Sequence, residues 1–122
     1  MKTYKDLDVY NEAFRLAADV HKMSMDLPKT EMYELGSQIR RSAQSVRANI
    51  VEGYGRRKYK ADFLRFLITA NASLLETESH LEMLNDLYDK DEIRRLIINS
   101  SDLGKKMHRF IEFVQKNWKT RS

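Results

Sequence analysis

The side chains that could carry chemistry in this sequence are concentrated in one basic run, Arg56-Arg57-Lys58-Tyr59-Lys60. Guanidinium and ammonium groups attract phosphate oxygens, and cations beside an aromatic ring are typical of proteins that bind unpaired nucleotides. Charge runs are more often plain solvated surface, so the run alone is weak support for a phosphate site. Its meaning depends on which other charges the fold places beside it.

A set of polar residues precedes the basic run at helical spacing. At 100° per residue, an apolar stripe is formed by Leu35, Ile39, Ala43, Val46 and Ile50, and a polar stripe beside it by Gln38, Ser42, Ser45, Asn49 and Glu52. Because Asn and Ser are poor helix formers, we expect these side chains to hydrogen-bond to something. Packing against a neighbouring helix or subunit is the favoured interpretation, and a ligand site is the alternative. Glu52 is expected to pair with Arg56, because the C-terminal end of a helix disfavours a carboxylate.

The sequence gives little support for catalysis or metal binding. It contains no cysteine, so disulfides, thiolate nucleophiles and cysteine-ligated zinc are excluded. No histidine completes the Glu-x-x-His pair of two-metal helical bundles, and Glu76 with His80 is better interpreted as an ion-paired surface. The segment Gly53–Gly55 lacks the third glycine of a dinucleotide-binding loop, and no Ser, His and acid grouping can be argued from spacing. We therefore expect a non-enzymatic protein with no catalytic residue, no metal and no cofactor.

The elements that must position these residues are helices. The few helix-breaking positions divide the chain at residues 27–30, 53–55 and 88–91. Apolar residues recur between the breaks at helical spacing, and no segment alternates with the period of two that a strand needs. The prediction is an all-α, antiparallel up-down-up-down four-helix bundle that forms one domain over residues 1–122, with helices at about 6–26, 31–52, 61–87 and 91–118.

Charge is distributed unevenly along the chain. Residues 40–60 carry seven Arg or Lys against one Glu, and residues 93–122 carry eight Arg or Lys against two acids. Residues 71–92 carry one Lys against seven acids. In an antiparallel bundle, the end of the second helix, the start of the third and the end of the fourth share one pole. The molecule is therefore expected to be bipolar, with one basic end that attracts phosphates.

This basic end defines a predicted nucleic-acid interface for RNA or DNA. Three aromatic residues near it, Tyr54, Tyr59 and Trp118, could stack on unpaired bases, although packing at the bundle end is favoured for Trp118. The predicted nucleic-acid contacts are Arg40, Arg41, Arg47, Arg56, Arg57, Lys58, Lys60, Arg65, Lys116 and Lys119.

The first and third predicted helices carry more apolar surface than one bundle core requires. Beside the main stripes lie Val9, Leu16, Val20, Leu64, Ile68 and Leu75. A broad core-facing surface accounts for part of this excess. We interpret the remainder as a subunit interface, because monomers rarely expose large contiguous apolar patches. Self-association is therefore predicted.

The composition bounds the class of protein. With 122 residues, 42% hydrophobic and 33% charged, the chain fits a single domain. No apolar run approaches the roughly 18 residues of a membrane span. The start, MKTYKDLDVY, is too charged for a secretory signal. We expect a cytoplasmic protein with no membrane contact.

Three sequence blocks carry a family resemblance: YKDLDVYNEAFRLA, YELGSQIRRSAQSVRANIVEGYGR and FLRFLITANASLLETESHLEML. In this order the chain resembles the proteins encoded by intervening sequences in bacterial 23S ribosomal RNA genes, which are related to the accessory variability determinants of diversity-generating retroelements. The resemblance implies an antiparallel four-helix bundle that assembles into a ring, typically a pentamer. It also implies a nucleic-acid role, because the retroelement relatives bind RNA and a reverse transcriptase through a basic surface. The residues that match the family's central block are Gln38, Arg40, Arg41, Ser45, Asn49, Glu52 and Gly53.

Two positions depart from the family pattern. Arg47 stands where the family usually has Pro, and Ala72 stands where it commonly has Gly. The first change removes any proline-dependent kink and adds a positive charge, and the second adds a methyl group at a helix contact. Neither change threatens the predicted fold.

Two functions remain open from the sequence. The leading hypothesis is an oligomeric module that binds RNA or DNA phosphates through its basic end with low sequence specificity. The alternative is a protein-interaction or scaffolding module that acts through the extra apolar faces of the first and third helices.

Overall fold

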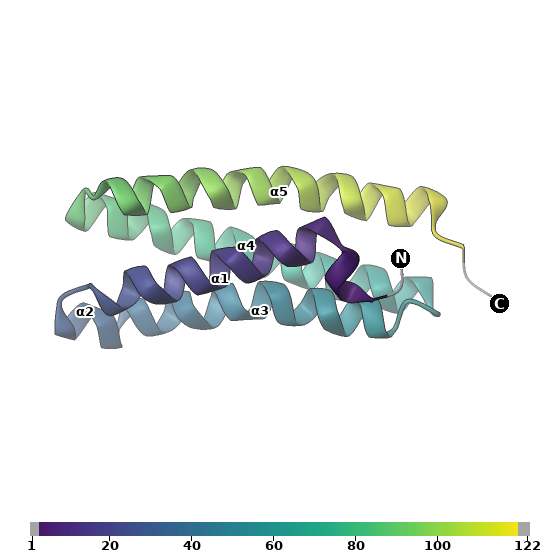
Figure 1. Ribbon diagram of the computed structural model, residues 1–122, viewed down its shortest axis with the longest axis horizontal. Helices are drawn as coiled ribbons and strands as arrows, with labels where there is room; N and C mark the ends of the chain where they lie inside the picture. Colours follow the sequence, from purple (N-terminus) through teal and green to yellow (C-terminus); the bar gives the residue numbers. More distant parts are fainter. Residues whose placement is uncertain (1–2, 120–122) are drawn as a thin grey trace.

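The computed structural model describes residues 3–119, which form four long helices and two short helical segments (Figure 1). In chain order these are the 3-10 turn η1 (Tyr4–Asp6), α1 (Asp8–Met25), α2 (Lys29–Tyr33), α3 (Leu35–Gly55), α4 (Lys60–Tyr88) and α5 (Asp91–Asn117). The described residues contain no strand. The all-α prediction is confirmed.

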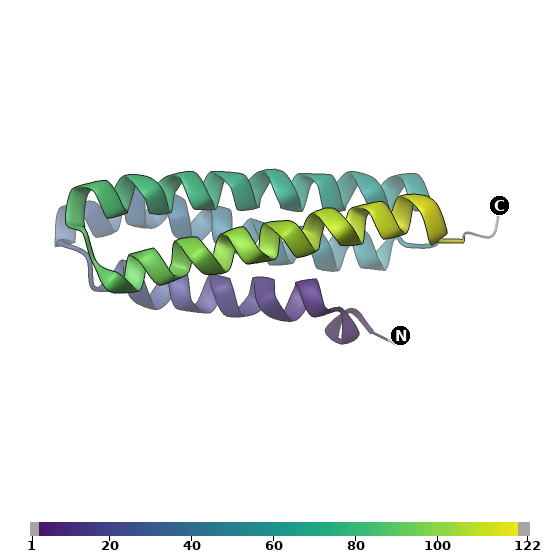
Figure 2. The ribbon, with the colours of Figure 1, turned by 90° about the horizontal axis from the view of Figure 1, so that it is seen from above.

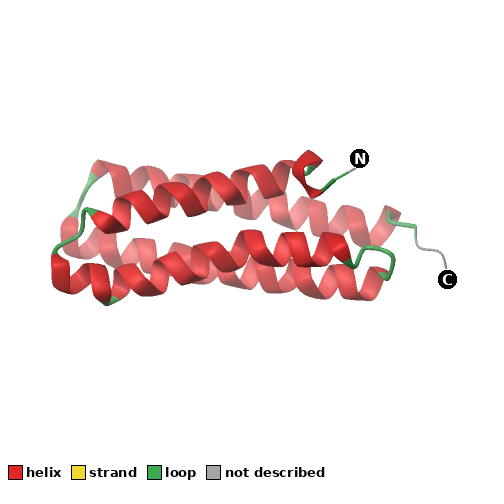
Figure 3. Ribbon diagram, turned by 60° about the horizontal axis from the view of Figure 1, so that its bottom comes forward, coloured by secondary structure: helices red, strands yellow, loops and turns green. Residues whose placement is uncertain are grey.

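The four long helices run alternately in opposite directions along one axis (Figures 1 and 2). α1 packs against α3 and α5, and α4 packs against the same two helices, so each long helix contacts two neighbours. The connections between helices are short (Figure 3). Short links join consecutive helices in antiparallel order. The predicted up-down-up-down four-helix bundle is therefore confirmed.

One continuous apolar core runs along the bundle. Every long helix contributes fully buried side chains, among them Val20 of α1, Ile39, Val46 and Ile50 of α3, Phe63, Leu67, Leu81 and Leu84 of α4, and Ile93, Leu103, Met107 and Val114 of α5. Removing such side chains from water stabilises a fold by roughly 25 cal/mol per Å² of apolar surface. The predicted core stripes are thus the ones that hold the bundle together. Of the described helices, none combines the length and the apolar content that crossing a bilayer requires.

Three residues predicted for a subunit interface belong to this core instead. Val9, Leu16 and Val20 of α1 are all buried within the chain. α1 lies between α3 and α5 and presents an apolar face to each of them. A helix in that position needs a wider apolar surface than a helix with one neighbour. The interface prediction was wrong for these three residues.

The second predicted helix differs from the structure at both ends. Glu34, with φ −92° and ψ −99°, separates α2 from α3. At the other end α3 continues through Gly53 to Gly55, and the chain reverses over residues 56–59. No described glycine has a positive φ. Gly53 instead faces α4, where a β-carbon would stand 3.0 Å from the Cβ of Phe66. The predicted break at 53–55 was wrong because this glycine permits a close helix contact and not a turn.

Candidate nucleic-acid interface

The basic run of the sequence forms the loop between α3 and α4, at the end of the bundle where α5 also ends (Figure 1). Two hydrogen bonds connect these segments. Lys60 Nζ donates to the carbonyl oxygen of Gln115 at 2.5 Å, and Trp118 Nε1 donates to the carbonyl oxygen of Arg57 at 3.2 Å. The predicted neighbourhood of the loop and the end of α5 is thus observed. We use the name basic pole for Arg56, Arg57, Lys58, Lys60, Arg65, Lys116 and Lys119.

An aromatic cluster supports the loop from inside the bundle. The buried ring of Phe63 packs edge-to-face with Trp118 at 5.0 Å, with Phe110 at 6.1 Å and with Tyr54 at 6.4 Å between ring centroids. Such pairs contribute about 0.5–1.5 kcal/mol each beyond their buried area. Tyr54 is only 5% exposed, whereas Tyr59 is 62% exposed. Trp118 therefore packs at the bundle end as favoured, and of the three aromatic candidates Tyr59 presents the most accessible ring.

Arg57 is a half-buried cation with a fixed geometry. The Cζ atom of its guanidinium lies 4.0 Å from the centroid of the Tyr54 ring, and Nη1 donates to the Tyr54 carbonyl oxygen at 3.0 Å. A cation over an aromatic face is attracted by the ring quadrupole. A guanidinium also has more N–H donors than this one bond uses. Arg57 can therefore hold its position and still bind a phosphate oxygen.

Two carboxylates reduce the positive charge on one side of the basic pole. Glu52 Oε2 lies 3.0 Å from Arg56 Nε, as the sequence predicted, and Asp62 contacts both Arg56 at 4.0 Å and Arg65 at 3.4 Å. Both guanidinium groups also lie over the ring of Phe66, at 5.0 and 4.9 Å. Exposed ion pairs contribute about 0–1 kcal/mol. These contacts therefore orient Arg56 and Arg65 more than they stabilise the fold.

Three lysines of the basic pole, Lys58, Lys116 and Lys119, are less constrained than Lys60. Lys58 Nζ lies 5.8 Å from the centroid of the Tyr59 ring, and Lys116 Nζ lies 3.8 Å from a carboxylate oxygen of Glu112. Lys119 is exposed just after the end of α5. An ammonium group on a flexible stem acts as a mobile point charge. Lys58 and Lys119 thus extend the positive potential of the pole into solvent.

Arg40, one of the predicted nucleic-acid contacts, lies in a different part of the bundle. Its Nη1 donates to Ser24 Oγ at 2.8 Å, and its Nη2 donates to the carbonyl oxygen of Met32 at 3.2 Å. These partners belong to the end of α1 and to α2, at the opposite end from the basic pole. The side chain of Ser24 is fully buried. Arg40 therefore connects three helices and is not part of the basic pole.

Arg41 and Arg47 are also separated from the basic pole. Arg41 is exposed near the start of α3, and Arg47 Nε donates to Gln44 Oε1 at 2.6 Å in the middle of the same helix. At about 1.5 Å of rise per residue, Arg41 stands roughly 22 Å from Arg56 along α3. The structure does not bring these two arginines together with the loop.

The polar stripe of α3 meets polar residues of α4. Thr77 Oγ1 donates to Ser42 Oγ at 2.9 Å, and the hydroxyl oxygens of Ser45 and Ser73 lie 2.8 Å apart. Asn49 Nδ2 donates to the Ser45 carbonyl oxygen at 2.8 Å. These partners fit the helix-packing interpretation, because the buried hydroxyls already have hydrogen bonds. The outer members of the stripe, Gln38 and Glu52, are exposed.

Two cations outside the basic pole have a pKa raised above the ordinary value. The pKa of Lys106 is raised first by its hydrogen bond to Glu12 and then by that to Asp8, whose Oδ2 lies 3.2 Å from Nζ. The pKa of Arg94 is raised mainly by its hydrogen bond to Asp91. Both groups remain charged at neutral pH. Local carboxylates pair with both groups and offset their charge, which weakens their attraction for a phosphate.

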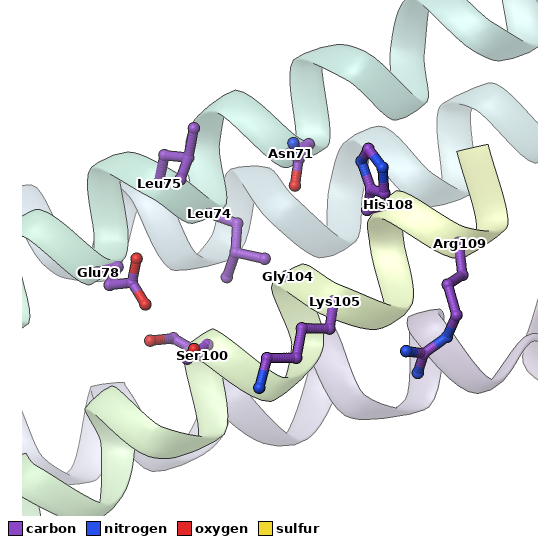
Figure 4. Close-up of a pocket in the computed structure, with 10 residues that line it drawn as sticks. Asn71, Leu74, Leu75, Glu78, Ser100, Gly104, Lys105, His108 and Arg109 are labelled. Carbon is purple, nitrogen blue, oxygen red and sulfur yellow. The ribbon is translucent and has the colours of Figure 1, made fainter. Parts of the chain in front are cut away.

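A groove of about 440 Å³ between α4 and α5 is a second surface feature, which the sequence did not reveal (Figure 4). Its walls are Asn71, Leu74, Leu75 and Glu78 from α4 and Ser100, Ser101, Gly104, Lys105, His108 and Arg109 from α5. Within residues 3–119 no three His, Asp or Glu side chains are grouped to hold a metal ion. The groove mixes apolar and charged residues that only the packing of two helices brings together.

Comparison with known proteins places the chain in a family. A family model described as 23S rRNA-intervening sequence protein matches residues 5–109. The chain is also similar to the crystal structure of a protein with unknown function from the S23 ribosomal protein family of Bacteroides thetaiotaomicron, at 24% identity and a TM-score of 0.77, over 85% of this chain and 95% of that one. No curated protein matches the chain. The structural likeness supports the fold alone, and the family match covers α1, the loop between α3 and α4 and most of α5. The chain belongs to the 23S rRNA-intervening sequence protein family.

Proposed function

We propose that this protein is a non-enzymatic, oligomeric module that binds RNA or DNA phosphates through its basic pole with low sequence specificity. The observation that carries the proposal is the convergence of the loop Arg56–Tyr59 with the end of α5, joined by the bonds of Lys60 and Trp118. Cations from two distant parts of the sequence thereby occupy one end of the bundle. Neutralising several phosphates releases counterions, which favours binding regardless of base sequence.

The arrangement of the cations supports backbone contacts and not the readout of base edges. Sequence is read when a helix or ribbon enters the major groove and presents side chains to the bases. Here the cations lie on a four-residue loop and at two helix ends. Arg57 supplies an oriented guanidinium, and Lys58 and Lys119 supply flexible charges. Such a mixture suits phosphates at variable positions.

The family adds support of a different kind. The model that matches the chain is named for intervening sequences of 23S rRNA. The resemblance of the sequence blocks separately implies a relation to accessory proteins of diversity-generating retroelements, which bind RNA through a basic surface. The same resemblance implies a ring, typically a pentamer. We include both expectations in the proposal, with the cytoplasm as the compartment.

Salt-dependent binding of a labelled RNA hairpin tests the proposed function. The variant Lys58→Ala/Lys119→Ala removes two exposed cations of the basic pole, and the matched control Lys22→Ala/Lys90→Ala removes two exposed lysines at the opposite end. Each lost phosphate contact should reduce the slope of log affinity against log salt by about 1. We expect a smaller slope for the first variant and no change for the control. No affinity at about 50 mM salt, or equal losses in both variants, would contradict the proposal.

Self-association is the second part of the proposal and rests on α4. Ile68 and Leu75 of α4 are each more than half exposed, with the exposed Ala72 between them and the half-buried Leu64 beside them. Exposed apolar residues that share one helix face are typical of protein contacts. Light scattering at micromolar concentration measures the mass. A value near 14.5 kDa would refute self-association, and Ile68→Asp should lower the mass of an oligomer.

The same α4 face, together with the neighbouring groove, favours a second candidate function, a protein-interaction or scaffolding module. The part of this alternative that relied on Val9, Leu16 and Val20 of α1 is withdrawn, because these residues are buried. A pull-down with the tagged protein distinguishes the candidates. The scaffolding function is favoured if a partner protein is still captured after nuclease treatment and is no longer captured by the Ile68→Asp variant.

A further inference from the structure

The aromatic residues at the basic pole differ in what they can contact. Tyr54 is buried beneath the guanidinium of Arg57, and Trp118 packs its ring on Phe63 and donates its indole N–H to the Arg57 carbonyl oxygen. Tyr59 projects from the loop and keeps most of its surface in water. Among the described residues, no second aromatic ring packs against it. Of the side chains that the structure describes, only the Lys58 ammonium is recorded over the Tyr59 ring, 5.8 Å from its centroid, and the 62% exposure of this residue leaves ring surface open to a planar ligand.

The backbone of Tyr59 is fixed, although its side chain is exposed. Its N–H donates to the carbonyl oxygen of Arg56 at 2.9 Å, and its carbonyl oxygen accepts from the N–H of Phe63 at 3.0 Å. Tyr59 is also the residue that caps the start of α4. A side chain on a fixed backbone has only its own rotamers to lose when its ring stacks on a ligand. The loop thus presents Tyr59 as a preorganised contact and not as a mobile tail.

Lysines precede and follow Tyr59 in the chain, and one of them lies over its ring. Lys58 Nζ lies over the ring, 5.8 Å from its centroid, and Lys60, the next residue in the chain, is bonded to the Gln115 carbonyl oxygen of α5. Arg57 follows one residue further back, with its guanidinium fixed over Tyr54. A nucleotide whose base stacks on Tyr59 would place its phosphates among these groups. Stacking platforms and cations that follow the backbone are the two parts of single-strand binding sites.

We infer that Tyr59 is a stacking platform that makes the basic pole select unpaired nucleotides in single-stranded RNA or DNA over paired ones. The inference rests on the proposed function, because it needs a polynucleotide at the basic pole, and it goes further by naming the class of nucleic acid and the residue that selects it. In a duplex the base faces are already stacked on each other, so only an unpaired base can cover the Tyr59 ring. Phosphates alone would not distinguish the two forms.

The test compares two labelled probes by fluorescence anisotropy at about 50 mM salt. One is a single-stranded oligouridylate of about 12 nucleotides, within the usual range of single-strand site sizes. The other is a sugar-phosphate strand of the same length and charge that lacks bases. The proteins are wild type, Tyr59→Ala, Tyr59→Phe and the matched control Tyr33→Ala, which removes a tyrosine of similar exposure, 64%, at the opposite end of the bundle. Circular dichroism checks that each variant remains helical.

Wild type should bind the oligouridylate about 5- to 150-fold more tightly than the abasic strand, the usual effect of stacking on one aromatic residue. Tyr59→Ala should lose this preference and keep its affinity for the abasic strand. Tyr59→Phe and Tyr33→Ala should behave as wild type, because stacking needs the ring and not the hydroxyl.

Two results would overturn the inference while the proposed function stands: equal binding of both probes by wild type, or an unchanged preference in Tyr59→Ala. If wild type binds neither probe, the proposed function fails and this inference fails with it. A lysine-flanked tyrosine also fits an anionic lipid surface. If wild type binds only phosphatidylserine vesicles and Tyr59→Ala weakens that binding, the ligand is a membrane and the inference is overturned.

Discussion

Replacing Gly53 by alanine adds one methyl group at a close contact between α3 and α4. The new Cβ would lie 3.0 Å from the Cβ of Phe66 and 3.3 Å from both the ring atom Cδ1 and the carbonyl oxygen of Phe63. The Phe63 ring can rotate away to some extent. The carbonyl oxygen and the Phe66 Cβ move only with α4 itself. Accommodating the methyl group therefore requires the two helices to separate by several tenths of an ångström.

Two opposing effects set the size of the change. Alanine is a better helix former than glycine by about 1 kcal/mol at an interior helix position. Overpacking a well-filled contact costs about 1–3 kcal/mol. The contact at Gly53 involves backbone and Cβ atoms, so we expect the cost to exceed the gain, with a net loss of about 1 kcal/mol. For a domain of this size that corresponds to a fall in Tm of about 3–6 °C.

Gly55 provides the matched control within the same helix. No atom lies within 4 Å of a Cβ built there, and its φ is not positive. Gly55→Ala should therefore gain up to about 1 kcal/mol from helix propensity alone. Urea and thermal denaturation at equal protein concentration measure both variants, because self-association would otherwise shift the apparent stability. If Gly53→Ala is as stable as Gly55→Ala, the helices do not approach as closely as described and the reasoning is refuted.

Three further substitutions test other parts of the structure by urea denaturation. Arg40→Met keeps the apolar stem and removes the hydrogen bonds to Ser24 Oγ and a backbone carbonyl, so the free energy of unfolding should fall by about 1–3 kcal/mol, with RNA affinity nearly unchanged. Thr77→Val should lower the free energy of unfolding by less than about 1 kcal/mol, because the Ser42 hydroxyl still donates to the Ile39 carbonyl oxygen. A loss above about 2 kcal/mol would contradict this expectation. Glu12 raises the folded-state pKa of Lys106 above its unfolded value of 10.5. The ion pairs of Lys106 therefore contribute their full stability below pH 10.5, and this stability is lost as the pH rises through the folded-state pKa. The stability difference between wild type and Lys106→Gln should stay constant from pH 7 to about pH 10 and shrink above it.

The spacing of apolar residues was sufficient to predict the bundle. Phe63, Leu67 and Leu74 recur at intervals that only a helix places on one face, and all three are buried. The role of Gly53 could not be predicted in the same way. A single sequence shows that a glycine lacks a Cβ, but turns and close helix contacts both use that property. Only the position of Phe66 on the neighbouring helix distinguishes them.

The candidate site shows the same limit. Arg40 and Arg56 are both helix-associated arginines, and local sequence gives no reason to separate them. Arg40 donates to Ser24, sixteen residues away, whereas Arg56 pairs with Glu52, four residues away. The local ion pair was predictable from helical spacing. The contact with Ser24 depends on how α1 packs against α3, which no short-range pattern encodes.

The bipolar charge and the apolar face of α4 both influence how copies of the chain would pack in an oligomer. α4 runs the length of the bundle from the basic pole to the end that carries Asp86 and Asp89. If copies associate in parallel along α4, their basic poles lie on one side and each bound strand meets several of them, which raises avidity through effective concentration. Coulomb attraction instead favours antiparallel copies, in which each basic pole lies beside an acidic end and its potential is partly cancelled. Salt screens that attraction within about 10 Å at 0.1 M, while the apolar contact between copies is little affected. A parallel oligomer should therefore become more stable as salt is added, and an antiparallel oligomer should become less stable. The salt dependence of the oligomer mass thus shows whether the basic poles lie next to one another or next to acidic ends.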